Sequence, residues 1–342
     1  MKTFFDTMAA ALARLQQPRV LVIGDLILDE HIEGDVERIS REAPVPIVEE
    51  RLRHLTPGGA ANTIYNLAKL GAQTTAMGVT GRDSAGSDLV QLLQQAGVET
   101  SGVLAVGEVP TTTKTRISAQ SRQSVMQQVL RLDRLPRGPL NPETLATLNA
   151  AIEAQVALAD VVIVSDYGQG VVVPELIETV RAAVKSHDKI WIVDSQEDLR
   201  LFHGASLLTP NKPEAENNLG YRIHDEATLA RAGETLLAET GAEALLITRG
   251  DEGMSLFQIQ GPNASVPALN RAAVFDVTGA GDTVVATLAL AAGSGCDWIE
   301  AMQLANLAAS IVIRRYGCST TTPAEMQETL QQMQRKEAPH AE

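Results

Sequence analysis

Short apolar runs alternate with helical patterns along most of this chain, and this alternation constrains the fold more than any other feature. The runs, which lack a clean polar alternation, lie at residues 19–23, 161–164, 189–193, 244–247 and 253–257. Helical patterns lie at residues 60–70, 85–96, 142–158, 174–184 and 228–239. Strands that alternate with helices of this length form βαβ units. The sequence therefore predicts an α/β fold with a mainly parallel central sheet and helices on both faces.

Two stretches break this rhythm. Residues 31–55 and 111–132 carry alternating, β-branched patterns with no helix inside either stretch. We expect them to form an antiparallel flap, a small β-sheet lid that is inserted into the chain and lies over the main sheet. Because there is no repeat or low-complexity segment, residues 1–336 are predicted to form a single domain, and residues 337–342 a disordered tail.

The composition excludes several classes of protein. A net charge of −14 and a pI near 4.9 oppose nucleic-acid binding. The two cysteines, Cys296 and Cys318, have no partner motif, which favours a reducing compartment. Residues 3–17 indicate an amphipathic helix, not a signal peptide, and no apolar run approaches the roughly 18 residues of a membrane span. We expect a cytoplasmic protein that binds neither nucleic acid nor membrane.

The clearest chemistry lies in the segment Asp-Val-Thr-Gly-Ala-Gly-Asp at residues 276–282, which precedes an apolar, helix-compatible segment. A helix start attracts anions through its unpaired N–H groups and positive dipole end. A phosphoryl group can bind the amides of Gly279, Ala280 and Gly281 while Asp282 takes the proton of an attacking hydroxyl. We expect the dipole to keep Asp282 acidic, and therefore a weak base, which suffices where the proton moves late.

A glycine-rich helix start with capping acids is the alternative interpretation of this segment, and spacing alone does not decide between the two. The chain contains neither the G-x-x-x-x-G-K-[ST] phosphate loop nor a G-x-G-x-x-G motif after a strand. If phosphate binds, the helix start must therefore hold it without either loop.

The chain resembles the ribokinase-like (phosphofructokinase-B) family of carbohydrate kinases. Three family motifs occur in the family's order: Gly58-Gly59-Ala60-Ala61-Asn62, Asn211-Lys212-Pro213-Glu214 and the complete signature at residues 276–282. The resemblance implies ATP and Mg²⁺, with Asn211 and Glu214 orienting magnesium through its waters. Helix capping is the alternative role for that pair.

The resemblance extends to other residues. It implies that the loop from Thr248 through Gly250 to Gly253 faces the nucleotide, with Asn306 near the adenine. On the sugar side it implies that Asp29 binds hydroxyls, that Gly58 and Gly59 allow close approach, and that Asn62 hydrogen-bonds the sugar. Asp276 is a candidate site for a monovalent cation such as K⁺.

Within the family, the chain is similar to kinases that phosphorylate heptose 7-phosphate at C1 in lipopolysaccharide-core precursor synthesis. The matching segments are residues 38–47, 111–116, 164–167 and 275–278. A phosphorylated substrate requires cations, and the lid candidates are Lys114, Arg116, Arg122 and Arg131. Two departures affect the substrate side: Gln196 stands where heptose kinases typically have lysine, and the flap segment at residues 118–128 is longer than usual.

Three functions remain in view. The first is a heptose 7-phosphate kinase, expected without the nucleotidyltransferase domain of bifunctional relatives, because the chain has no His-x-Gly-His motif. The second is a related kinase for another sugar, sugar acid or nucleoside. The third is a non-catalytic regulator that binds nucleotide or sugar, although such a protein needs no base at Asp282. We also expect a homodimer that pairs through the lid, because exposed lid edges are costly.

Overall fold

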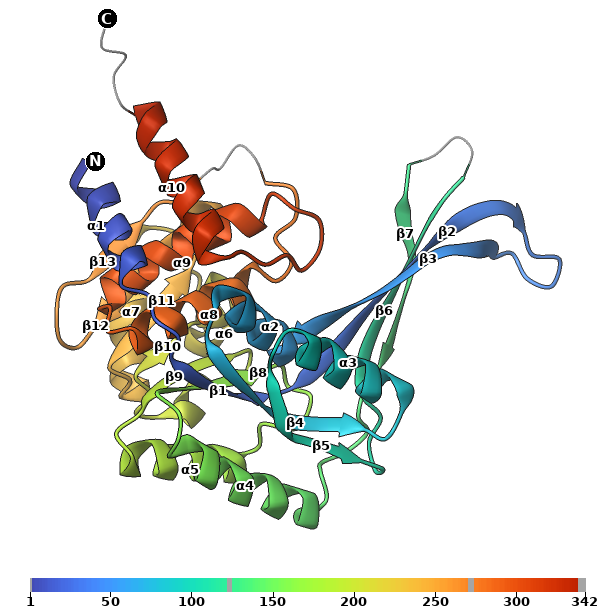
Figure 1. The fold of residues 1–342 in the computed structure, drawn as a ribbon, viewed down its shortest axis with the longest axis horizontal. Coiled ribbons are helices and arrows are strands. Elements are labelled where there is room, and N and C mark those ends of the chain that lie inside the picture. Colours follow the sequence, from blue (N-terminus) through green and yellow to red (C-terminus); the bar gives the residue numbers. More distant parts are fainter. Residues whose placement is uncertain (1, 122–124, 270–273, 338–342) are drawn as a thin grey trace, which may run out of the picture.

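The computed structural model describes residues 2–121, 125–269 and 274–337, and its centre is a nine-stranded sheet in the order β13-β12-β11-β10-β9-β8-β1-β4-β5 (Figure 1). The strands from β11 to β5 are parallel, whereas β12 pairs antiparallel with β11 and with β13. The bounds are β1 (Arg19–Gly24), β4 (Gln73–Gly81), β5 (Glu99–Val106), β8 (Val161–Asp166), β9 (Ile190–Ser195), β10 (Leu207–Leu208), β11 (Ala244–Thr248), β12 (Met254–Gln258) and β13 (Ala264–Val266).

Helices cover both faces of this sheet. One face packs on α1 (Lys2–Ala13), α2 (Ala60–Leu70), α3 (Ser84–Gln95), α8 (Ala280–Gly293), α9 (Trp298–Val312) and α10 (Pro323–Glu337). The other packs on α4 (Pro142–Val156), α5 (Pro174–Ser186), α6 (Lys212–Leu219) and α7 (Glu226–Thr240). Along β1, Val20 and Val22 enter the first core and Leu21 and Ile23 the second. Successive strand residues point to opposite faces, so a strand that is buried on both faces has the unbroken apolar run seen in the sequence.

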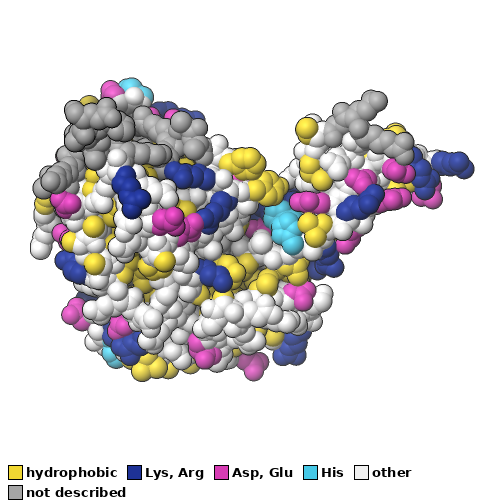
Figure 2. Space-filling model, turned by 45° about the horizontal axis from the view of Figure 1, so that its top comes forward, with side chains coloured by type: hydrophobic (Ala, Val, Ile, Leu, Met, Phe, Trp, Pro, Cys, Tyr) yellow, Lys and Arg dark blue, Asp and Glu magenta, His cyan; other side chains and the backbone are white. Residues whose placement is uncertain are grey.

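A second sheet of four strands, in the order β3-β2-β6-β7, forms the lid. Its strands are β2 (Leu26–Ile39), β3 (Pro46–Gly59), β6 (Thr112–Gln120) and β7 (Gln127–Arg134). The lid projects from the main body (Figure 1), and the space-filling view shows a hollow between the two (Figure 2). Both hairpins are antiparallel as predicted, but β2 and β6 pair in parallel, so the sheet is mixed.

The predicted α/β class, the sheet and the lid are confirmed, whereas several elements escaped prediction. The segment of β4 mixes threonines and glycines with apolar residues, although its Thr74 and Thr80 are buried, and β10 spans only two residues. Helix α6 contains a proline in its first turn and two asparagines, which are poor helix formers. No helix in the described ranges is long and apolar enough to cross a membrane. The predicted disordered tail falls almost wholly on residues 338–342, outside the described ones.

Candidate active site

The candidate site lies at the carboxyl ends of the parallel strands, where α8 begins and the lid joins the body. Asp282, in the first turn of α8, is 6% exposed. Its Oδ1 accepts hydrogen bonds from the hydroxyls of Tyr167 (2.7 Å) and Thr63 (3.0 Å), and its Oδ2 accepts one from the amide of Asn62 (2.6 Å). Two segments far apart in the sequence, α2 and the loop after β8, thus orient one carboxylate on α8.

The environment of Asp282 corrects the expectation that the helix dipole keeps this residue acidic. Burial raises the pKa of Asp282, and the hydrogen bonds from Tyr167, Asn62 and Thr63 oppose that rise without cancelling it. The nearby charge of Asp29 raises the pKa further. Desolvation therefore outweighs the dipole, and the carboxylate is a stronger base than its position in the first turn suggested.

The Gly-Ala-Gly turn is built partly as predicted. Gly279 caps α8 with φ of 75°, and a Cβ there would lie 2.6 Å from Nδ2 of Asn62, so glycine is required. Gly281 is exposed at the helix start. The amide of Ala280, however, donates to the carbonyl oxygen of Val277 at 3.2 Å. The N–H group of Ala280 is therefore not free to bind an anion, and the predicted anion nest must rely on the N–H groups of Gly279 and Gly281.

Asn62 and its neighbours join α2 to α8. The amide of Asn66 donates to the backbone carbonyl oxygen of Asn62 (2.9 Å) and to its Oδ1 (3.2 Å), while Thr283 donates to Oδ1 of Asn66 (2.8 Å). Each member of this network is buried. The family resemblance implied that Asn62 hydrogen-bonds the sugar, but its side-chain amide nitrogen donates to Asp282.

Tyr167 is a site residue to which the sequence analysis gave no role. It follows β8 in a loop whose backbone is held by Asp25, which accepts hydrogen bonds from the amides of Tyr167, Gln169 and Val171 at 2.8, 3.0 and 3.1 Å. Burial raises the pKa of the Tyr167 hydroxyl well above its usual value, so it remains a hydrogen-bond donor. The sequence feature that could have pointed to Tyr167 is its position directly after a buried strand, where ligands bind in open α/β sheets.

Two adjoining cavities open beside Gly281, and Thr248, Gly281 and Val284 line both. The larger, about 230 Å³, is mainly apolar, and its lining includes Gly250, Gly253, Ile313 and Asn306. The amide of Asn306 donates to the carbonyl oxygen of Pro267 (2.8 Å). All four residues predicted to bind nucleotide away from the metal therefore meet around one space. Its volume and mainly apolar lining suit a nucleobase.

The smaller cavity, about 130 Å³, is acidic. Asn211 and Glu214 both line it, and they also form the capping box of α6. The backbone N–H of Glu214 donates to Oδ1 of Asn211 (2.9 Å), and the backbone N–H of Asn211 donates to Oε2 of Glu214 (2.7 Å). The two residues therefore do cap α6, as the alternative interpretation expected. Capping is compatible with a role in orienting magnesium, because both residues also line the cavity.

Asp166 and Asp194 complete the acidic lining. Burial raises the pKa of Asp166 to about 6 and that of Asp194 to about 8, where the charges of Asp282 and Glu214 add to the effect. Among the residues that line this cavity in the described part of the chain there is no Lys or Arg, and Gln196 lies at its wall. These carboxylates therefore lack a cationic partner. No three His, Cys, Asp or Glu residues of the described ranges are placed to hold a metal directly.

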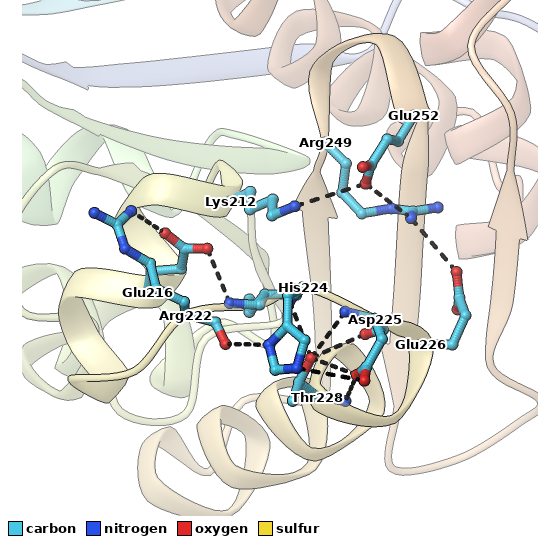
Figure 3. Close-up of polar contacts among 10 residues, drawn as sticks. Lys212, Glu216, Arg222, His224, Asp225, Glu226, Thr228, Arg249 and Glu252 are labelled. Carbon is cyan, nitrogen blue, oxygen red and sulfur yellow. Dashed lines mark hydrogen bonds and ion pairs between the residues drawn. The ribbon is translucent and has the colours of Figure 1, made fainter.

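Ion pairs brace the loop between β11 and β12 (Figure 3). Nη1 of Arg249 lies 3.4 Å from Glu252 and 3.7 Å from Glu226, and Nζ of Lys212 lies 3.8 Å from the same Glu252. These contacts join the loop to the starts of α6 and α7. The positive charges beside the loop are thus partly neutralised by its own carboxylates.

On the lid side, Asp29 and Arg116 form an ion pair of 2.7 Å. Asp29 is buried, and a Cβ on Gly58 would lie 2.5 Å from its Oδ2, so the backbone of β3 runs directly against this carboxylate. Gly59 is the N-cap residue of α2. Asp29 was expected to contact the hydroxyls of a substrate and Arg116 its phosphate, but in this structure the two side chains contact each other.

The remaining predicted cations differ in position. The ammonium of Lys114 lies 5.7 Å from the ring centre of Tyr167, next to the site. Arg131 pairs with Asp133 through two contacts of 2.8 Å and is largely exposed. Arg122 lies outside the described residues.

Asp276 and Cys318 lie near Arg116, whose charge acts on both residues. Asp276 accepts hydrogen bonds from the amide and hydroxyl of Thr278 (2.9 and 2.7 Å) and from the amide of Gly317 (2.9 Å). Burial raises its pKa, but these bonds outweigh burial and hold the pKa below its usual value, so it stays anionic. Cys318 is a free thiol whose pKa burial raises to about 12, with Asp29 and Asp282 nearby, and the sequence analysis assigned it no role.

Curated relatives match nearly the whole chain. The bifunctional protein HldE of Pelobacter propionicus is 41% identical over 314 residues, and that of Wolinella succinogenes is 39% identical over 315. Each match covers 92% of this chain but only 63% and 65% of the relative. The chain thus spans a little under two thirds of the length of these proteins.

Solved structures show the same fold at low identity. Ribokinase of Arabidopsis thaliana, complexed with ribose and ATP, superimposes with a TM-score of 0.70 at 20% identity, covering 92% of this chain and 99% of its own. Phosphofructokinase-2 of Escherichia coli gives 0.73 at 19% identity, covering 94% and 100%. The family model described as "pfkB family carbohydrate kinase" matches residues 17–325. The chain therefore belongs to the pfkB family of carbohydrate kinases and is a sugar kinase.

Proposed function

We propose that this sugar kinase transfers the γ-phosphate of Mg·ATP to C1 of heptose 7-phosphate, a step in lipopolysaccharide-core precursor synthesis. The observation that carries the proposal is the position of Asp282, which lies between two cavities suited to a nucleotide and a lid bearing Lys114 and Arg116. The choice of heptose 7-phosphate as the sugar rests on the similarity to the HldE relatives. Because the chain spans only part of their length, their full activity is not carried over.

In the proposed reaction, the sugar hydroxyl attacks the γ-phosphorus in line, the bond from that phosphorus to the β,γ-bridging oxygen breaks, and ADP leaves. Asp282 accepts the hydroxyl proton. Its Oδ2 receives one hydrogen bond among the described residues, from Asn62, so a second acceptor position remains for the substrate. The raised pKa of Asp282 suits this role, since it strengthens the base.

The amides at the start of α8 would stabilise the charge that develops on the transferring group. Gly279 and Gly281 are the donors that we assign to this anion hole, with the helix dipole adding to their effect. Ala280 contributes only if its bond to Val277 opens. The anion hole is therefore smaller than the sequence alone suggested.

The acidic cavity fits magnesium, which prefers oxygen ligands and keeps most of its water. Glu214, with Asn211 beside it, would hold the ion through water, and Asp194 lines the same space. Bound magnesium would offset the charge of the nucleotide phosphates. We also propose Asp276, which remains anionic, as part of a K⁺ site.

Asp29 is proposed to bind sugar hydroxyls once Arg116 turns toward the substrate phosphate, with Lys114 assisting. Gln196 favours a second candidate, a kinase of the same family for a different sugar. A lysine at that position would place a positive charge beside the carboxyl groups of Asp166 and Asp194, and glutamine does not.

A coupled assay of ADP release over a panel of sugars tests this proposal. The panel contains heptose 7-phosphate, heptose, fructose 6-phosphate, fructose, ribose and a nucleoside. Heptose 7-phosphate should give the highest kcat/KM. Turnover only with an unphosphorylated sugar would replace the heptose assignment, and no ADP release with any acceptor would indicate a binding protein instead of an enzyme.

A further inference from the structure

Four side chains able to carry positive charge lie in one row across the four strands of the lid. In the register of the sheet, His31 on β2 lies opposite His54 on β3 and beside Arg116 on β6, and Arg116 lies opposite Arg131 on β7. Residues paired across neighbouring strands share a face of the sheet. The face is that of Asp29 and Lys114, which are likewise neighbours in register, two residues closer to the catalytic end.

The two histidines are stacked, with ring centroids 4.8 Å apart and planes inclined by 3°. They are the histidines of the described lid strands, and Figure 2 shows histidine side chains in the hollow between the lid and the body. Both are partly exposed, so a ligand in the hollow can reach them.

The distance along the strand suits a sugar that carries a terminal phosphate. Asp29 and His31 are two residues apart on β2, which corresponds to roughly 7 Å at the rise of a β-strand. A sugar whose hydroxyls contact Asp29 would therefore place a phosphate at its far end near the row of His31 and Arg116. The proposed base, Asp282, lies close enough to Asp29 for the charge of Asp29 to act on it, whereas the charges that act on His31 are those of His54, Arg116, Asp29 and Glu33.

We propose that His31 and His54, together with Arg116 and Arg131, form a binding site for the phosphate that the sugar already carries, and that the histidine pair is a specificity determinant of this chain. The inference rests on the proposed function, because it assumes a phosphorylated sugar. The row supplies two guanidinium groups for an oxyanion and two imidazoles that become donors at both nitrogens when protonated.

The charges on this face explain the need for the histidines. On this face of the lid the charged residues in and beside the row are Asp29 and Glu33 on β2, Lys114 and Arg116 on β6, and Arg131 and Asp133 on β7. The three cations and three carboxylates cancel, so a dianionic phosphate lacks net positive charge unless histidine is protonated. In the ligand-free protein, burial lowers the pKa of His31, and the nearby His54 and Arg116 lower it further. A bound phosphate opposes these effects, so binding takes up a proton.

The test uses the full chain, the double variant His31→Gln/His54→Gln and, as a matched control, His224→Gln, an exposed histidine between α6 and α7. Dissociation constants are measured calorimetrically for heptose 7-phosphate and for heptose at pH 6.5 and 8.5. The chain and the control should bind the phosphorylated sugar roughly three- to tenfold more tightly at the lower pH, because one proton is taken up. The double variant should lose that dependence and about tenfold in affinity for the phosphorylated sugar, while its affinity for heptose remains unchanged.

A second measurement separates this inference from the identity of the sugar. Inorganic phosphate is titrated into the chain with ¹⁵N-labelled histidine, and the His31 ring resonances, assigned with the single variant, should shift toward the protonated form. If heptose 7-phosphate does not bind but phosphate still shifts His31, the heptose assignment fails and the phosphate site stands. If phosphate leaves both lid histidines unchanged, or the double variant binds heptose 7-phosphate as the unmodified chain does, the inference is overturned.

Discussion

The side-chain amide of Asn62 donates a hydrogen bond of 2.6 Å to Oδ2 of Asp282, although 220 positions separate the two residues. The bond crosses from the first turn of α2 to the first turn of α8. A residue that sequence motifs associate with the sugar thus acts on the proposed base. Because a hydrogen bond to a carboxylate stabilises its charged form, Asn62 also tunes the pKa of Asp282.

This bond predicts the pH profile of Asn62→Ala. Loss of the donor should raise the pKa of Asp282, so less of the base is deprotonated at a given pH. The acidic limb of the kcat profile should move upward by about one pH unit, the equivalent of one hydrogen bond to a charged group. Steady-state kinetics at saturating ATP between pH 5 and 9 measure the shift. An acidic limb that stays in place would show that Asn62 does not tune the base.

Asp282→Asn tests the base directly. The amide cannot accept the hydroxyl proton, so kcat should fall by roughly 10²–10⁴, while the nucleotide affinity measured by calorimetry stays nearly unchanged. Asp188→Asn, an exposed change in the turn before β9, is the matched control and should keep full activity. Near-native turnover of Asp282→Asn would exclude the proposed role.

The two glycines of the turn should respond differently to alanine. Gly279→Ala places a Cβ 2.6 Å from Asn62 at φ of 75°, and should lower the free energy of unfolding by about 1–3 kcal/mol and reduce kcat. At Gly281 no atom lies within 4 Å of an added Cβ. Gly281→Ala should therefore change stability by no more than about 0.5 kcal/mol but raise the KM for ATP, because the methyl group occupies the nucleotide cavity. Denaturation with urea and steady-state kinetics separate the two outcomes, and equal losses of stability would refute the geometry.

The acidic cavity predicts how stability depends on pH. Asp166 and Asp194 have folded-state pKa values near 6 and 8, both above the value of 3.8 for an unperturbed Asp. At pH values between the unfolded-state pKa of 3.8 and these folded-state values, the folded state binds more protons than the unfolded state. The contribution of these two residues to the free energy of unfolding is therefore greatest at low pH and is lost as the pH rises through 6 and 8. Without Mg²⁺, the midpoint of thermal unfolding should decline from pH 5.5 to 8.5.

Asp194→Asn should flatten this decline, because the amide does not titrate, whereas Asp188→Asn should leave it unchanged. Thermal unfolding of the three proteins in one buffer series provides the comparison. Equal slopes for Asp194→Asn and the unmodified chain would mean that Asp194 is already charged near neutral pH.

The lid predicts the oligomeric state. Leu130 and Leu132 on the edge strand β7 are 54% and 59% exposed, and the backbone of that edge is open to pairing. We expect a dimer at micromolar concentration and a monomer for Leu132→Asp, measured by analytical ultracentrifugation. Leu158→Asp, at a residue of similar exposure (57%) on the body, should remain dimeric. A monomeric unmodified chain would contradict lid pairing.

Local patterns in the sequence were sufficient for the class of fold and for the position of the glycine turn at the start of α8. Strands buried on both faces, such as β1 and β8, leave unbroken apolar runs, and Gly279 and Asp282 lie where a glycine and an acid at a helix start predict them. These features depend on neighbours along the chain. Strands such as β4 were missed because their burial is set by partners elsewhere.

Only the tertiary structure decided what surrounds Asp282 and which residues of the lid meet. The hydrogen bonds from Asn62, Thr63 and Tyr167, and the desolvation that raises the pKa, arise from segments more than 100 residues away. The row of His31 and Arg116 likewise exists because β2 pairs with β6 in one register, and a shift by one residue would turn these side chains to opposite faces. Periodicity reports which face of an element is buried, but contacts between distant segments depend on how those elements are assembled.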